Sequence, residues 1–164
     1  MEDLTLNELC VKAVELLKTK GLKCTFAESL TGGLIASSLV SVSGASDVLE
    51  GSLVSYSDRI KNEMLKVSSS TLEEDTAVSS SCAVQMAMGA KTMFGADIAV
   101  SATGYAGPTG GTEDDPAGTF YIGFSDSFTS GSKRFCLADS TRQEVRDFAA
   151  LCAMRILVYR LESL

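Results

Sequence analysis

The architecture follows from the stretch Leu22–Val42, which reads LKCTFAESLTGGLIASSLVSV. The short apolar run over 22–27 is typical of a buried strand, and residues 31–33 (Thr-Gly-Gly) then begin a helix over 34–42. A strand that passes directly into a helix is the building unit of α/β proteins. We therefore expect the hydroxyl of Ser29 to stand at the carboxyl edge of a sheet, where such proteins bind ligands.

The alternation of helix and strand continues along most of the 164 residues. A capping box, Thr5-x-x-Glu8, begins a helix that ends at Gly21. Further helices are expected over 60–65, 80–94 and from 141 onward, with a second capping box at 71–74, and further strands over 53–56, 98–100, 119–124 and, as one more candidate, 134–137. No crossover helix precedes the strand at 119, which favours an antiparallel pair and a mixed sheet.

The last helix has the clearest pattern. Two overlapping capping boxes, Ser140-x-x-Gln143 and Thr141-x-x-Glu144, mark its start. Apolar residues at helical spacing predict one buried stripe, made of Val145, Phe148, Ala149, Cys152, Ile156 and Tyr159. Together the patterns predict an α/β fold, in which residues 1–164 form a single domain with helices on both faces of a mixed central sheet.

Composition excludes several classes of protein. The chain has no histidine, which excludes Ser-His-Asp and Cys-His sites and zincins. Its net charge of −7 is unfavourable for a nucleic-acid partner. Five cysteines without a CxxC pair are expected to be core residues in a reducing compartment. Residues 1–7 lack a signal-peptide pattern and no apolar run approaches ~20 residues, so we expect a cytoplasmic protein with no membrane partner.

The first polar segment with a functional pattern is the junction after residue 27. Ser29 is followed by Thr31, Gly32 and Gly33, whose backbone N–H groups at a helix start would suit an anion or an oxyanion. A capped turn between strand and helix is the alternative interpretation.

The second segment, residues 56–61, places Tyr56 at a strand end and Lys61 about one turn into a helix. In a chain without histidine, a lysine near a serine can serve as the general base, because Ser-Lys pairs replace Ser-His pairs in some hydrolases. Such a lysine must lose its proton, which requires burial or nearby positive charge. Tyr56 could orient it or relay the proton. A solvated surface lysine is the alternative.

The third segment is the loop 104–118, which holds both prolines and five of the 14 glycines. Long loops of this kind in compact domains are functional or disordered. Thr103 can donate a hydrogen bond at the strand end, and the loop glycines, among them Gly107 and Gly110, let a ligand approach the backbone. The acidic run 113–115 suggests either a Mg²⁺ site or a solvated loop tip.

Two arginines complete the candidate residues. Arg142 and Arg146 are one turn apart on the face of the last helix away from its apolar stripe. Guanidinium groups at this spacing can hold a phosphate bidentately, and surface ion pairs are the alternative.

Six motifs occur in order along the chain: AESxTGG from Ala27, YSxxxK from Tyr56, AVS from Ala77, TGxAGPxGG from Thr103, PxGT from Pro116 and RxxVR from Arg142. Together they resemble the CinA C-terminal domain family, the nicotinamide-nucleotide amidohydrolases, over about Leu6 to Leu161. One departure is Tyr105, which stands where that family usually has a smaller or aliphatic residue.

The resemblance implies hydrolysis of nicotinamide mononucleotide to nicotinate mononucleotide and ammonia, without a metal or organic cofactor, by a homo-oligomer with a three-layer α/β/α fold. It implies that Ser29 is the nucleophile and that Lys61 and Tyr56 assist it. The expected substrate-binding residues are Thr31, Gly32, Gly33, Thr103, Tyr105, Gly107, Gly110, Arg142 and Arg146. Three alternatives stay open: a nucleotide-binding module without turnover, an amidase for another small amide, and a metal-dependent hydrolase that uses Glu113, Asp114 and Asp115.

Overall fold

The computed structural model describes residues 4–164, so residues 1–3, part of the segment considered for a signal peptide, lie outside the described part. The strands are β1 (Cys24–Glu28), β2 (Leu49–Val54), β3 (Ile98–Gly104), β4 (Thr119–Ser125) and β5 (Ser130–Cys136). The helices are α1 (Leu6–Lys20), α2 (Leu34–Val40), α3 (Asp58–Leu65), α4 (Ser80–Phe94) and α5 (Arg142–Ser163).

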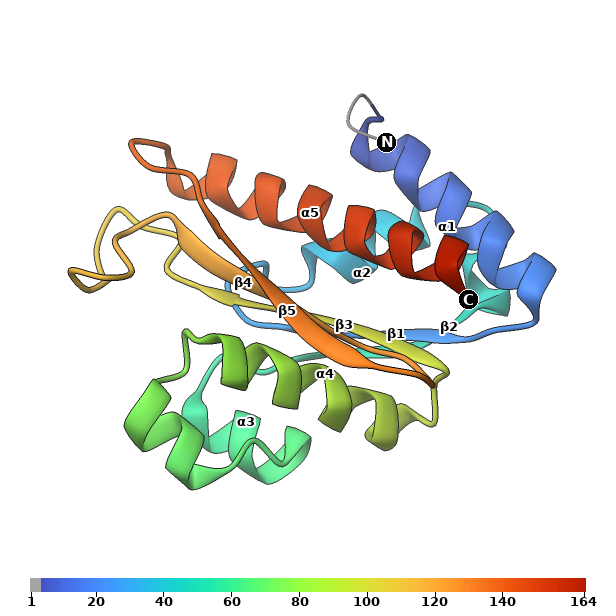
Figure 1. The fold of residues 1–164 in the computed structure, drawn as a ribbon. Coiled ribbons are helices and arrows are strands. Elements are labelled where there is room, and N and C mark those ends of the chain that lie inside the picture. The colour runs from blue at the N-terminus through green and yellow to red at the C-terminus, as the bar shows by residue number, and fades with distance from the viewer. Residues whose placement is uncertain (1–3) are drawn as a thin grey trace.

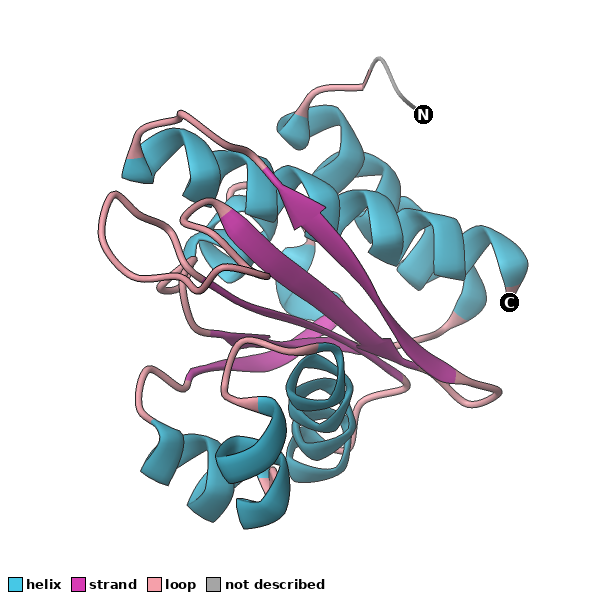
Figure 2. Ribbon diagram, turned by 60° about the vertical axis from the view of Figure 1, so that its left-hand side comes forward, coloured by secondary structure: helices cyan, strands magenta, loops and turns pink. Residues whose placement is uncertain are grey.

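The strands form one mixed sheet in the order β2-β1-β3-β4-β5. β1 runs parallel to β2 and β3, whereas β4 is antiparallel to both of its neighbours. α1, α2 and α5 cover one face of the sheet, and α3 and α4 lie against the other (Figure 1). Figure 2 shows the twisted sheet between these two helical layers. The expected α/β sandwich with a mixed sheet is confirmed.

The helix ends follow their capping residues. Thr5 and Glu8 make both bonds of the capping box, and Gly21 ends α1 in the left-handed conformation at φ 67°. Thr141 and Glu144 make the same pair of bonds at the start of α5. The overlapping box does not form: Thr141 is the N-cap residue, and the hydroxyl of Ser140 donates to the carbonyl of Ala138.

Two strands differ from their predicted bounds. β2 covers Leu49–Val54 rather than 53–56, so Tyr56 lies beyond the strand and is 63% exposed. β5 begins at Ser130 rather than at 134 and ends at Cys136. Both strands lie at the edges of the sheet and have no fully buried position, so no continuous apolar run marks them.

Two local predictions were wrong. The predicted capping box at Thr71 is a π-helical turn over 71–75, in which the Thr71 hydroxyl accepts hydrogen bonds from Ser68 and Gln85. Tyr159, placed in the buried stripe of the last helix, is 57% exposed. The second half of α5 packs beside α1 and therefore buries a different face, which carries Met154, Leu157, Val158 and Leu161.

Four of the five cysteines occupy the positions expected of core residues, and the fifth does not. Cys10, Cys24, Cys82 and Cys152 are buried free thiols, and Cys136 is an exposed one. Within residues 4–164, no helix has the length and apolar character that crossing a bilayer requires.

Candidate active site

The carboxyl ends of β1 and β3 open into a cavity of about 240 Å³. Six of the predicted site residues line it: Ser29, Tyr56, Lys61, Thr103, Tyr105 and Arg142. They come from the ends of two strands, one helix start, the β2–α3 connection, the loop after β3 and the start of α5. This is the sheet edge at which the order of parallel strands places a ligand site in α/β proteins.

Ser29 and Lys61 meet in this cavity. Ser29 follows β1 directly, and its backbone N–H donates to the carbonyl of Ala102, which ties the residue to β3. Lys61 lies one turn into α3 and is 2% exposed, so its ammonium has left bulk water. Its Nζ donates to Ser29 Oγ at 3.4 Å. The alternative of a solvated surface lysine is therefore wrong.

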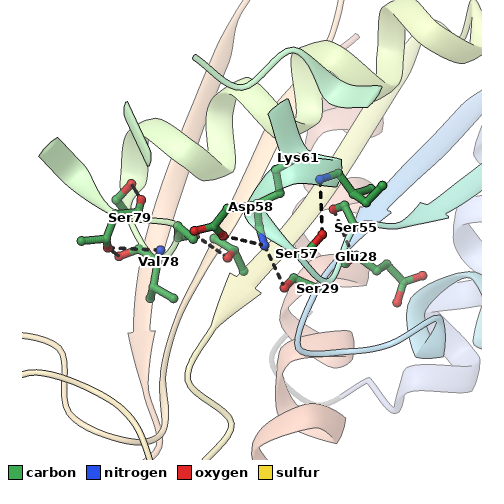
Figure 3. A network of polar contacts seen from close by, with 12 residues as sticks. Glu28, Ser29, Ser55, Ser57, Asp58, Lys61, Val78 and Ser79 are labelled. Carbon is green, nitrogen blue, oxygen red and sulfur yellow. Dashed lines mark hydrogen bonds and ion pairs between the residues drawn. The ribbon is translucent and has the colours of Figure 1, made fainter. Parts of the chain in front are cut away.

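The surroundings of Lys61 favour loss of its proton. Burial lowers the pKa of the Lys61 ammonium, because a charged group is poorly solvated there. Cys82 and Asp58 act in the opposite direction on this pKa, and the Asp58 carboxylate lies 3.9 Å from Lys61 Nζ. Figure 3 shows the lysine nitrogen between Ser29 and Asp58. Burial also raises the pKa of the Cys82 thiol to about 11, so that thiol is protonated at neutral pH.

The start of α2 is occupied by a carboxylate of the protein itself. Glu28 is fully buried, and its side chain accepts hydrogen bonds from the backbone N–H groups of Gly33, Ile35 and Ala36. The N–H of Gly32 donates to the Ser29 carbonyl. Gly32 and Gly33 therefore shape the turn, with φ of 61° and 99°, and their N–H groups are not free for an anion.

Arg146 and Thr31 lie behind the turn 29–33 rather than in the cavity. Arg146 Nε donates to the Leu30 carbonyl at 3.1 Å, and its Nη2 donates to the Thr31 carbonyl at 3.0 Å. Its Nη1 donates to Gln143 Oε1. The Thr31 hydroxyl is buried and has no hydrogen-bond partner among the described residues. The arrangement holds the backbone that follows Ser29 and differs from the expected two-arginine phosphate clamp.

Arg142 connects the cavity wall to the glycine-rich loop. Its Nη2 donates to the Tyr56 hydroxyl at 2.8 Å, and its Nη1 donates to the Gly107 carbonyl at 3.0 Å. Tyr56 and Arg142 are 86 residues apart in the sequence, and the folded chain brings them into direct contact. Gly107 and Gly110 do not line the cavity; both take positive φ values, 75° and 88°, which let the loop turn over it.

Thr103 and Tyr105 close the remaining side. The Thr103 hydroxyl donates to the Ala77 carbonyl at 2.6 Å and so holds the segment before α4 against the cavity. Tyr105 is fixed by two backbone bonds, to Thr119 and from Gly118. Its side chain lines the cavity.

Comparisons with known proteins identify the family of the chain. Residues 6–161 match the CinA C-terminal domain family. The chain belongs to that family. It is 45% identical over 125 residues to the nicotinamide-nucleotide amidohydrolase PncC of Enterobacter agglomerans. The aligned region covers 76% of this chain and 76% of that protein. It is 41% identical over 143 residues to a CinA-like protein of Fervidobacterium nodosum, which covers 87% of this chain.

Solved structures of the family have the same fold. The competence damage-inducible protein A from Klebsiella pneumoniae matches with a TM-score of 0.92 at 33% identity and covers 97% of this chain and 98% of that chain. The competence/damage inducible protein CihA from Agrobacterium tumefaciens also gives 0.92, at 33% identity, and covers 98% and 99%. The chain spans 25% to 37% of the length of the first curated relatives that it matches.

Several residues of this CinA-family cavity were not predicted: Leu30, Asp58, Ala77, Val78, Ala106 and Thr109. Asp58 could have been found from its spacing, since residues three apart on a helix share a face with Lys61. Ala77 and Val78 belong to a family motif but have no reactive side chains, and the hydrogen bond from Thr103 to the Ala77 carbonyl holds their segment at the cavity.

Two residues of the acidic run 113–115 hold the loop against the sheet. The Asp115 carboxylate accepts hydrogen bonds from Tyr121 and Arg134, and the Asp114 carbonyl accepts one from Arg134. These bonds tie the loop to β4 and β5. Residues 4–164 contain no group of three or more acidic or cysteine side chains that could hold a metal ion.

Proposed function

We propose that this chain hydrolyses the carboxamide of nicotinamide mononucleotide to nicotinate mononucleotide and ammonia, with Ser29 as the nucleophile and Lys61 as its base. The observation that carries the proposal is the contact of 3.4 Å between Ser29 Oγ and a lysine that burial drives toward its neutral form. The similarity to the Enterobacter agglomerans amidohydrolase supports the choice of substrate.

Neutral Lys61 takes the proton of Ser29 as Ser29 Oγ bonds to the carboxamide carbon and the carbonyl electron pair moves to oxygen. The lysinium then gives that proton to the amide nitrogen as the C–N bond breaks and ammonia leaves. Water attacks the acyl-enzyme, Lys61 accepts its proton, and Ser29 regains a proton as the nicotinate product departs. Each proton that Lys61 takes up is returned within the cycle.

The cavity supplies the remaining contributions. Thr103 and Tyr105 line the wall beside Ser29, and Arg142 offers a cation at the rim for the phosphate. We assign the oxyanion donors to the backbone of the loop 106–111, because the N–H groups of Gly32 and Gly33 already have acceptors. One such donor contributes about 3–4 kcal/mol to the transition state in comparable sites.

The cellular setting is part of the same proposal. The five cysteines are all thiols, which suits a reducing compartment such as the cytoplasm. The family resemblance predicts a homo-oligomer, and sedimentation velocity of the purified chain tests that prediction.

Ammonia release from nicotinamide mononucleotide tests the function. We expect turnover by the wild type, with or without a chelator, and a loss of at least about 10³-fold in Ser29→Ala. Ser43→Ala is the matched control, because Ser43 is exposed and lies outside the cavity. Near-wild-type release by Ser29→Ala contradicts the nucleophile assignment. Tight binding without release indicates a nucleotide-binding module, and preference for a different amide indicates another amidase.

A further inference from the structure

Lys61 has one carboxylate partner within ion-pair distance among the described residues, and that partner belongs to the cavity. Asp58 Oδ1 lies 3.9 Å from Lys61 Nζ, and Asp58 lines the cavity. The two residues are three positions apart on α3, where Ser57 caps the helix and Asp58 is the first helical residue. Residues at this spacing share a face of the helix, so α3 presents the carboxylate and the ammonium together.

We propose that Asp58 is a positioning residue for the pair formed by Ser29 and Lys61. Its carboxylate holds the Lys61 side chain toward Ser29 and stabilises the positive charge that forms on Nζ when Ser29 loses its proton. In that step the Ser29 O–H bond breaks, the proton bonds to the Lys61 lone pair, and the Oγ electron pair bonds to the carboxamide carbon. The inference rests on the proposed function and adds a third member to its catalytic network.

The other groups around Lys61 cannot take this role. Ser29, which follows β1, and Thr103 in β3 have hydroxyl groups, and Cys82 in α4 is a buried thiol in its neutral form. Tyr56 from the β2–α3 connection and Tyr105 from the loop after β3 are phenols. Arg142 from α5 is a second cation, which would oppose rather than stabilise a charge on Lys61. Asp58 is therefore the source of compensating negative charge.

Burial and the Asp58 carboxylate have opposite effects on the pKa of Lys61. Burial alone favours neutral Lys61, but a lysine that cannot hold a proton is a poor base. A carboxylate nearly 4 Å away, itself 62% exposed on its side chain, raises the proton affinity of Lys61 moderately because water screens it. The net effect lowers the pKa of Lys61 from its ordinary value, which is the direction that a general base at neutral pH requires.

The inference is tested by the pH dependence of the Asp58→Asn variant. Removal of the carboxylate should lower the pKa of Lys61, so the acid limb of kcat/KM moves toward lower pH by about one unit. The plateau of kcat should fall several-fold, because the lysinium loses its stabilising charge. Asp58→Glu, which keeps the carboxylate, should have its acid limb within about half a pH unit of the wild-type position. Asp58→Ser, which suits a helix start, repeats the test without the amide.

Glu63→Gln is the matched control, since Glu63 lies on the same helix, pairs with Arg59 and does not line the cavity. It removes the same charge from α3 and should leave the acid limb in place. If Asp58 acted only by stabilising the start of α3, Asp58→Asn would lower the thermal stability without moving the acid limb of kcat/KM.

A direct titration separates this inference from the proposed function. In protein labelled with ¹³C at the lysine ε carbon, the Lys61 signal is assigned by its loss in Lys61→Arg and followed against pH. We expect Asp58→Asn to lower its midpoint by about one unit and Glu63→Gln to leave it unchanged. An unchanged or raised midpoint in Asp58→Asn overturns the inference, even if ammonia is released. Absence of ammonia release by the wild type contradicts the proposed function, whatever the titration shows.

Discussion

The substitution Glu28→Gln tests the carboxylate that holds the turn between β1 and α2 together. Glu28 is fully buried and accepts backbone hydrogen bonds of 2.9, 3.1 and 2.9 Å from Gly33, Ile35 and Ala36. Glutamine has nearly the same shape but one acceptor oxygen, so its NH₂ group must face at least one of these donors. The change therefore removes charge and leaves the volume almost unaltered.

The expected cost follows from these bonds. One buried donor left without an acceptor costs about 1–3 kcal/mol, and two bonds that change from charge-assisted to neutral lose about 0.5–1.5 kcal/mol each. The free energy of unfolding should fall by about 3 kcal/mol. A domain of this size loses roughly 2–4 °C in melting temperature per kcal/mol, so Glu28→Gln should melt about 6–12 °C lower.

Thermal unfolding followed by circular dichroism measures this effect, and urea unfolding gives the free energy independently. Glu144→Gln is the control, because Glu144 also accepts backbone and side-chain bonds at a helix start but is exposed. It should lose much less than Glu28→Gln. Equal losses in the two variants, or a loss below about 0.5 kcal/mol in Glu28→Gln, would show that the buried cap is not what stabilises this turn.

Three further predictions concern the cavity. Burial lowers the pKa of Lys61, so kcat/KM should fall as the pH drops through that lowered pKa and should be constant above it. A kcat/KM that does not fall between neutral pH and the lowest pH at which the protein stays folded would contradict a lysine base. Arg142→Lys should raise KM for the nucleotide about tenfold more than KM for the nucleoside. Arg146→Lys should lower kcat, and should lower the free energy of unfolding by about 1–2 kcal/mol, without changing the preference for the nucleotide. If both variants raise KM for the nucleotide in the same way, the two arginines form the expected phosphate clamp. Tyr105→Ala should widen the cavity and shift kcat/KM toward bulkier carboxamides on the order of tenfold, and an unchanged ranking across a panel of amides would show that Tyr105 does not select the substrate.

Much of the fold could be predicted because its signals are local. Capping boxes at Thr5 and Thr141 and the left-handed Gly21 depend on neighbours within four residues, and all three formed as expected. The edge strands β2 and β5 could not be bounded in this way. Their exposed positions tolerate polar residues, and their ends are set by pairing with β1 and β4.

The residues of the candidate site were likewise predictable only where the signal was local. Ser29 and Lys61 were predicted from residue type and spacing, because a chain without histidine leaves few general bases. Asp58 was missed although it lies three residues from Lys61, since an acidic first turn of a helix is common for other reasons. Arg146 was expected at the phosphate and instead holds two backbone carbonyls.

Residue order alone determined that the chain is an α/β protein with a hydroxyl at a sheet edge and an amine one turn into a helix, since periodicity, caps and turns are short-range properties. Packing determined which of these groups meet. Lys61 becomes a candidate base only where α3 and α4 exclude water from it, and Arg142 reaches Tyr56 only because the sheet brings residues 86 positions apart into contact. Desolvation and long-range contact depend on the whole folded chain, which is why no local pattern could specify them.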